Sequence, residues 1–101
     1  MKPVARQMEL ERMRTAVERT YNCAALHLYT WPVQETVGEK SWRGEVEIFA
    51  LRAKPESAIC YAWMPDAGFT DRIFTVLAAP PVRSPGEAVR TRLRGEATEQ
   101  A

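Results

Sequence analysis

The fold is decided by the stretch Trp42-Arg43-Gly44-Glu45-Val46-Glu47-Ile48-Phe49-Ala50-Leu51. Apolar side chains alternate with charged ones through its first seven residues, and a period of two is typical of a β-strand with two different faces. One side of this strand is expected to carry Trp42, Val46, Ile48 and Ala50, and the other Arg43, Glu45 and Glu47. Because a slip of one residue would invert every side chain, this alternation also constrains how the neighbouring strands align.

β-rich segments flank this strand on both sides. The preceding segment bends at Pro32, which has no amide hydrogen to offer a ladder, so that strand is expected at an edge or at a bulge. Turns rich in Gly, Pro and Asp separate the following segments, and short turns favour an antiparallel meander. The four expected strands cover residues 26–37, 42–51, 58–64 and 72–78.

Helical patterns begin and end the chain. From about residue 4 to residue 22, apolar side chains recur at intervals of three and four. Ser84-Pro85-Gly86-Glu87 has the form of a capping box with proline at the first helical position, and Gly95 is expected to end the second helix. The sequence therefore predicts an α+β fold of order α-β-β-β-β-α. It is a two-layer fold, with a four-stranded antiparallel meander sheet, an N-terminal helix and a short C-terminal helix on one face. A single domain is expected over residues 1–95, followed by a frayed tail over residues 96–101.

The expected register follows from burial. If Val37 opposes Trp42 and Ala53 opposes Glu56, six apolar residues share the face that the N-terminal helix should cover. These residues are Trp31, Val33, Val46, Ile48, Tyr61 and Trp63. The other face is then acidic at one end, at Glu45 and Glu47, and apolar at the other.

Composition limits the classes of function. The 101 residues are 46% hydrophobic, which is enough for a core without a metal or a disulfide. The 14 basic and 13 acidic residues give a net charge of +1, so no global field attracts polyanions or membranes. The N-terminus lacks the apolar segment of a secretory signal, and no segment has about 18 uninterrupted apolar residues for a membrane span. Two cysteines suit a reducing compartment, so we expect a cytoplasmic protein with no membrane partner.

Glu35 is the first candidate for a functional side chain. The expected register points its carboxylate toward the helix side, opposite Gly44, where a missing side chain leaves room for a ligand. Aromatic residues around one carboxylate suit an apolar ligand with a cationic or hydrogen-bonding group. The expected ligand pocket consists of Tyr29, Trp31, Glu35, Trp42 and Trp63. The alternative is that Glu35 lies at the sheet margin, solvated or paired with an arginine, and that the aromatic residues form packed core.

The second candidate is an outward apolar patch. The expected register leaves several apolar residues on the face opposite the helices, where they could expose several hundred Å², around the upper limit for a monomer. We interpret this patch as the contact face of a homodimer. Its residues are Phe49, Leu51, Ala58, Cys60, Ala62 and Met64.

The remaining polar residues favour structural roles. His27 is the only histidine, which removes the commonest metal cages, so no metal and no cofactor are expected. Cys23 and His27 could form a thiol and a base, but they straddle a helix-to-strand junction where no regular geometry fixes their distance. Glu45 and Glu47 are best interpreted as a solvated strand face.

A basic C-terminus raises the alternative of RNA binding. It contains Arg83, Arg90, Arg92 and Arg94, and the order of elements is similar to that of double-stranded RNA-binding domains. Those domains clamp phosphates with lysines at the start of their last helix, whereas this helix starts with Ser84-Pro85-Gly86-Glu87. Nucleic acid is therefore the least favoured partner.

Three parts of the chain carry a resemblance to other proteins. They are Trp42-Arg43-Gly44-Glu45-Val46-Glu47-Ile48-Phe49, then Tyr61-Ala62-Trp63, and then Val76-Leu77 and Pro80-Pro81-Val82-Arg83-Ser84-Pro85 with Ala88-Val89. Together they resemble a group of small uncharacterised bacterial proteins over residues 27–93. The resemblance implies no activity and no catalytic residue, and it does not cover the N-terminal helix.

Two interpretations of function remain, with RNA binding third. The first is a non-enzymatic domain that acts as a homodimer and binds a protein or a small apolar or cationic molecule. The second is a small enzyme in which Glu35 serves as acid or base within the aromatic pocket. The sequence alone identifies neither the ligand nor the partner.

Overall fold

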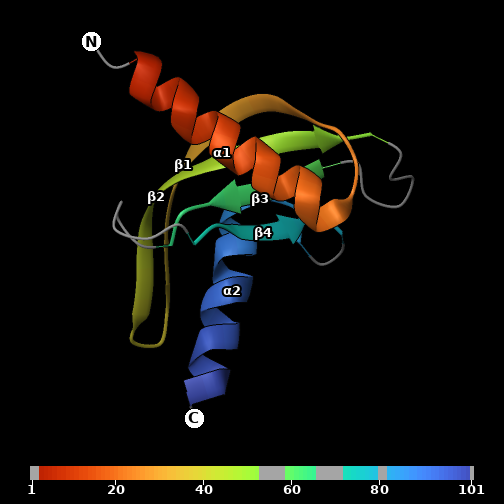
Figure 1. Cartoon of the computed structure of the whole chain (residues 1–101). Coiled ribbons are helices and arrows are strands. Elements are labelled where there is room, and N and C mark those ends of the chain that lie inside the picture. The colour runs from red at the N-terminus through yellow and green to blue at the C-terminus, as the bar shows by residue number, and fades with distance from the viewer. Residues whose placement is uncertain (1–2, 53–58, 66–71, 80–81, 101) are drawn as a thin grey trace.

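A computed structural model describes residues 3–52, 59–65, 72–79 and 82–100. Two helices and four strands follow in the expected order, and the strands form one antiparallel sheet of order β1-β2-β3-β4. The predicted α-β-β-β-β-α order and the meander are confirmed (Figure 1). The elements are α1 (Pro3–Tyr21), β1 (Ala25–Val37), β2 (Lys40–Leu51), β3 (Ile59–Trp63), β4 (Phe74–Leu77) and α2 (Pro85–Gln100).

The start of α2 matches the prediction, and its end does not. The backbone N–H of Glu87 donates to Ser84 Oγ, so Ser84 caps the helix as predicted. The Glu87 carboxylate reaches one residue farther back than in a standard capping box, because Oε1 accepts from the N–H of Arg83 rather than that of Ser84. Gly95 does not end the helix, which continues to Gln100. A glycine inside a helix costs only about 1 kcal/mol relative to alanine, and this cost does not stop a helix whose flanking residues favour it.

The β1–β2 hairpin closes more tightly than expected. Val37 opposes Lys40 rather than Trp42, and Gly38 has a φ of 59° in the turn between them. Such a positive φ favours glycine because a side chain at that position would be strained. The shift amounts to two residues, so each side chain from Tyr29 to Val37 keeps its predicted face, but Glu35 now opposes Trp42 and Val33 opposes Gly44.

The β2–β3 register agrees with the prediction. The predicted pair Ala53–Glu56 lies outside the described residues. The same register places Ile48 opposite Tyr61, and this pair is observed. Val46 and Ile48 therefore share a face with Tyr61, whereas Glu47 opposes Ala62 and points to the other side.

A bulge in β1 reverses the alternation near its start. The register shifts between His27 and Tyr29, because Leu28 is an extra residue with no partner on β2. Tyr29 opposes Ile48, and His27 opposes Phe49. His27 and Tyr29 therefore lie on opposite faces of the sheet although they are two residues apart.

The two helices pack against opposite faces of the sheet, which differs from the expected two-layer arrangement. In Figure 1, α1 crosses in front of the strands, whereas α2 begins behind them and runs beside the β1–β2 hairpin. Met13 and Val17 of α1 belong to a core with Phe49, Leu51, Cys60 and Ala62. Ala88, Val89 and Leu93 of α2 belong to a second core with Val46, Ile48, Tyr61 and Trp63. The N-terminal helix thus covers the face opposite to the predicted one.

This arrangement removes the predicted dimer face. Phe49, Leu51, Cys60 and Ala62 are buried beneath α1, and Met64 packs against the same cluster. Ala58 lies outside the described residues. The physical reason is that β2 and β3 carry apolar side chains on consecutive positions, as strands do when helices cover both faces.

Neither helix of the described residues is long and apolar enough to cross a membrane.

Candidate binding surface

Helix α2 packs against the carboxylate of Glu35. Its Oε1 lies 3.2 Å from Nε of Arg90, and both side chains are partly exposed. Gly86 brings the first turn of α2 against the same carboxylate, since a Cβ added there would lie 2.7 Å from Glu35 Oε2. The predicted position beside Gly44 is wrong, because the ring of Trp42 covers that glycine. The alternative in which an arginine pairs with Glu35 describes what is observed.

The structure divides the expected aromatic pocket into two parts. Trp42 and Trp63 pack with their ring centroids 6.1 Å apart, and the indole N–H of Trp42 donates to the carbonyl of Met64. Trp63 is 2% exposed and also meets Phe74 edge to face. These rings are part of the α2-side core. Tyr29 and Trp31 lie nearer the start of β1 and meet each other, with centroids 6.5 Å apart and ring planes at 85°.

A buried carboxylate on the α1 side was not predicted. Glu47 is 2% exposed, its Oε1 accepts a hydrogen bond from Thr30, and His27 Nε2 lies 2.8 Å from the same oxygen. The expectation that Glu47 is solvated is wrong, although Glu45 is exposed as predicted. A buried carboxylate requires hydrogen-bond donors, and the bulge supplies one by turning His27 toward Glu47. In the sequence, the only hint of this contact is that two hydrogen-bonding side chains, His27 and Thr30, stand on the preceding strand.

The His27–Thr30–Glu47 contact has the chemistry of a structural link. Glu47 could orient the imidazole of His27, as a carboxylate does in many catalytic sites, but a nucleophile would also be needed. The thiol of Cys23 makes no hydrogen bond to His27. Within residues 3–52, 59–65, 72–79 and 82–100, no three His, Cys, Asp or Glu side chains gather where they could hold a metal ion.

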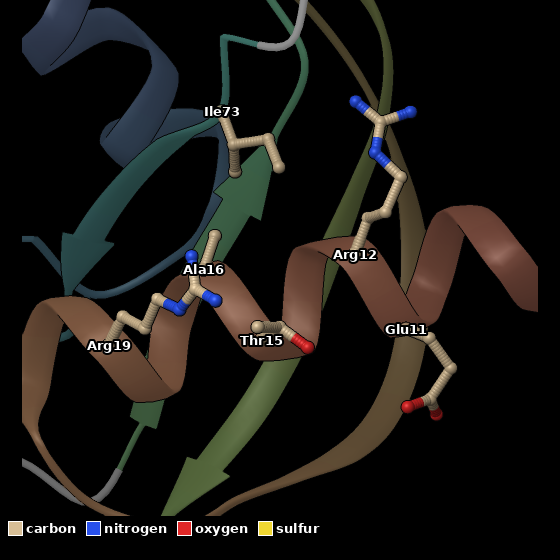
Figure 2. Close-up of a pocket in the computed structure, with 6 residues that line it drawn as sticks. All are labelled: Glu11, Arg12, Thr15, Ala16, Arg19 and Ile73. Carbon is tan, nitrogen blue, oxygen red and sulfur yellow. The ribbon is translucent and has the colours of Figure 1, made fainter.

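A groove between α1 and the start of β4 is lined by arginines. Its residues are Glu11, Arg12, Thr15, Ala16, Arg19 and Ile73 (Figure 2). Arg12 and Arg19 are seven residues apart, which is about 10 Å along a helix, and Figure 2 shows their guanidinium groups well separated. Glu11, at the margin of the groove, pairs with Arg14. The two guanidinium groups are therefore not arranged to chelate one small anion.

Two of the three arginines of α2, Arg90 and Arg92, make contacts within the chain. Arg92 lies over the ring of Phe74, with Cζ 4.0 Å from the centroid, and Arg90 pairs with Glu35. Arg72 contacts the same ring, with Cζ 5.1 Å from the centroid. The Arg92–Phe74 contact joins α2 to β4, and the Arg90–Glu35 pair joins α2 to β1. They neither support nor exclude RNA binding, which stays a prediction from the sequence.

Exposed apolar side chains gather on β1. Among the described residues five large apolar side chains are exposed, and four of them belong to this strand. The exposed fractions are 58% for Leu26, 44% for Leu28, 49% for Tyr29 and 54% for Trp31. β1 is also an edge strand of the sheet, since β2 is its one neighbour among the strands of the described residues. An edge that carries large apolar side chains is a ready template for a partner.

The bulge aligns three of these side chains on one face. Leu26, Tyr29 and Trp31 oppose Ala50, Ile48 and Val46, which are alternate residues of β2. We call these three residues the open row. The next residue of the same face is Val33, which is buried in the core that α2 completes. The open row is therefore the part of the α2-side face that α2 leaves uncovered.

Comparisons of the chain with protein-family models, with curated proteins and with solved structures found no match.

Proposed function

We propose that the protein is a non-enzymatic binding domain that holds a protein partner on the open row of β1. The supporting observation is the concentration of exposed apolar side chains at Leu26, Tyr29 and Trp31, with Leu28 beside them. Half-exposed side chains of this size present on the order of 400 Å² of apolar surface, which is comparable to the largest patch on a typical monomer. Patches of this size are often functional.

The types of residue also suit a protein partner. Tyrosine and tryptophan are enriched at protein interfaces and supply much of the binding energy there, because they offer a large area with few rotatable bonds. A small molecule is usually held in a concave site that covers most of its surface. The open row lies on a sheet face beside an edge, so a partner with an extended surface fits it better.

The enzyme alternative has less support. It requires a carboxylate that can exchange a proton with a substrate, and Glu35 is the side chain expected in this role. Arg90 and Gly86 of α2 occupy the surroundings of Glu35, and two of the four expected aromatic residues belong to the packed core. A binding role uses the remaining two, Tyr29 and Trp31.

The proposal is tested by selecting short random peptides from a display library on the immobilised protein. Selected peptides should bind the wild type and lose at least tenfold in affinity when Tyr29 and Trp31 are both replaced by Ala. Met8→Ala is the matched control, because Met8 is also an exposed large apolar residue but belongs to α1. If the peptides bind the double variant as tightly as the wild type, the open row is not the binding surface and the proposal fails.

A further inference from the structure

We infer that the partner on the open row is a second copy of this chain, joined to the first by antiparallel association of the two β1 strands. This inference rests on the proposed function, because it assigns the occupant of the same surface. Four features of β1 and its surroundings support it: the spacing of the row, its lack of charge, the area that it offers and the position of Pro32.

The spacing of the open row matches a twofold axis. Leu26, Tyr29 and Trp31 oppose alternate residues of β2, so they follow one another at equal steps along one face. A strand that meets its own copy antiparallel has a twofold axis through its middle residue, and the interface is self-complementary. With the axis at Tyr29, the two Tyr29 side chains meet each other. Trp31 of one copy then meets Leu26 of the other, which places a large side chain against a smaller one on both sides.

Charge favours self-association at β1 over the other edge of the sheet. The segment from Leu28 to Gln34 contains no charged residue, and the net charge of the chain is only +1. Two copies can therefore approach along β1 without facing like charges. The opposite edge strand, β4, lies between Arg72 and Arg92, which both contact Phe74. Two such edges would bring arginines together and repel each other.

The area indicates a weak, concentration-dependent dimer. Two open rows with Leu28 beside them offer on the order of 800 Å², of which side-by-side strands bury only a part, whereas specific interfaces bury about 1,200–2,000 Å². The remaining area would come from the main chains of the two edges. Pro32 lacks an amide hydrogen, so strand pairing ends before it and is limited to the segment that contains the row. We therefore expect a dimer that forms in the micromolar range.

The first experiment measures molar mass by sedimentation velocity from about 1 µM to about 500 µM, a range suited to an interface of this size. The mass of the full chain should rise from 11.5 kDa toward twice that value. Tyr29→Lys and Tyr29→Glu should each remain monomeric at every concentration, because each places two like charges at the twofold axis. Met8→Lys is the control for added charge, and it should dimerise as the wild type does.

A mixture of the two variants gives the more specific result. Tyr29→Lys and Tyr29→Glu should form a heterodimer when mixed in equal amounts, since the two charges then attract across the axis. This recovery requires that position 29 of one copy faces position 29 of the other. A partner other than a second copy does not produce it.

The outcomes separate the inference from the proposed function. A wild type that remains monomeric at about 500 µM, but whose row still binds selected peptides, overturns the second copy as partner and leaves the binding surface intact. A dimer that persists in both Tyr29 variants also overturns the inference, because another surface then carries it. A monomeric wild type whose selected peptides ignore Tyr29 and Trp31 overturns both.

Discussion

Nε2 of His27 lies 2.8 Å from Oε1 of Glu47, and this contact joins β1 to β2 beside the bulge. Glu47 is buried, and Thr30 donates a second hydrogen bond to the same oxygen. Removing a buried acceptor leaves its donors unsatisfied, and the cost is larger than the net value of the bonds themselves. The contact therefore fixes how the start of β1 is oriented, including the open row on its other face.

Glu47→Ala should lower the free energy of unfolding by about 3 kcal/mol, because His27 and Thr30 lose their common acceptor and a cavity remains. Glu45→Ala is the matched control. Glu45 points to the same side of β2 two residues earlier but is exposed, so its loss should change stability by no more than about 0.5 kcal/mol. Urea unfolding followed by tryptophan fluorescence measures both. Equal losses in the two variants would mean that Glu47 is solvated.

The sequence predicted most of the fold because apolar and charged residues alternate clearly through the first part of β2, from Trp42 to Ile48. The β2–β3 register follows from keeping Trp63 and Glu47 on different faces, and the structure has this arrangement. The bulge at Leu28 could not be predicted, because one extra residue in a strand leaves no mark in the composition. That single residue decides that His27 meets Glu47 and that Tyr29 and Trp31 lie with Leu26.

The placement of the helices was harder to predict for a different reason. Both helices carry an apolar stripe, and either stripe could cover either face of the sheet. The consecutive apolar residues Ile48-Phe49-Ala50-Leu51 do indicate a strand that is buried on both sides. Giving this run more weight than the alternation before it would have predicted a helix on each face, and would have placed Phe49 and Cys60 in a core.

Alanine substitutions at Gly86 and, as the control, at Gly95 test the contact between α2 and Glu35. Gly95→Ala should stabilise the protein by about 0.5–1 kcal/mol, because the helix gains a better helix former and nothing lies within 4 Å of the new Cβ. Gly86→Ala should stabilise it less, because its Cβ would displace the Glu35 carboxylate from Arg90. In a Glu35→Ala background this deficit should disappear, which a double-mutant cycle by urea unfolding measures. A deficit that persists without the Glu35 carboxylate would contradict the contact.

The two free cysteines should react at different rates. Cys60 is buried in the α1-side core, and burial raises the pKa of its thiol to about 12, so almost no thiolate is present at neutral pH. Cys23 is partly exposed at the end of α1. A thiol reagent at neutral pH should therefore modify one group per chain in the native state and two in denaturant. Cys23→Ser should then show no native labelling, whereas rapid native labelling of that variant would mean that Cys60 is accessible.

The same thiol makes stability depend on pH in the alkaline range. The pKa of Cys60 rises from 9.0 to about 12 chiefly because burial disfavours the thiolate. The folded protein therefore keeps a proton that the unfolded chain releases, so the stabilisation is complete below about pH 9 and is lost as the pH rises toward about 12. Cys60→Ala removes this dependence, although its stability at neutral pH is lower because a cavity forms. Between about pH 9 and pH 10.5 the wild type should lose about 1 to 2 kcal/mol more than the variant in urea unfolding. Parallel pH profiles would show that the Cys60 thiol ionises as easily in the folded protein as in the unfolded chain, and therefore that α1 does not seal this core.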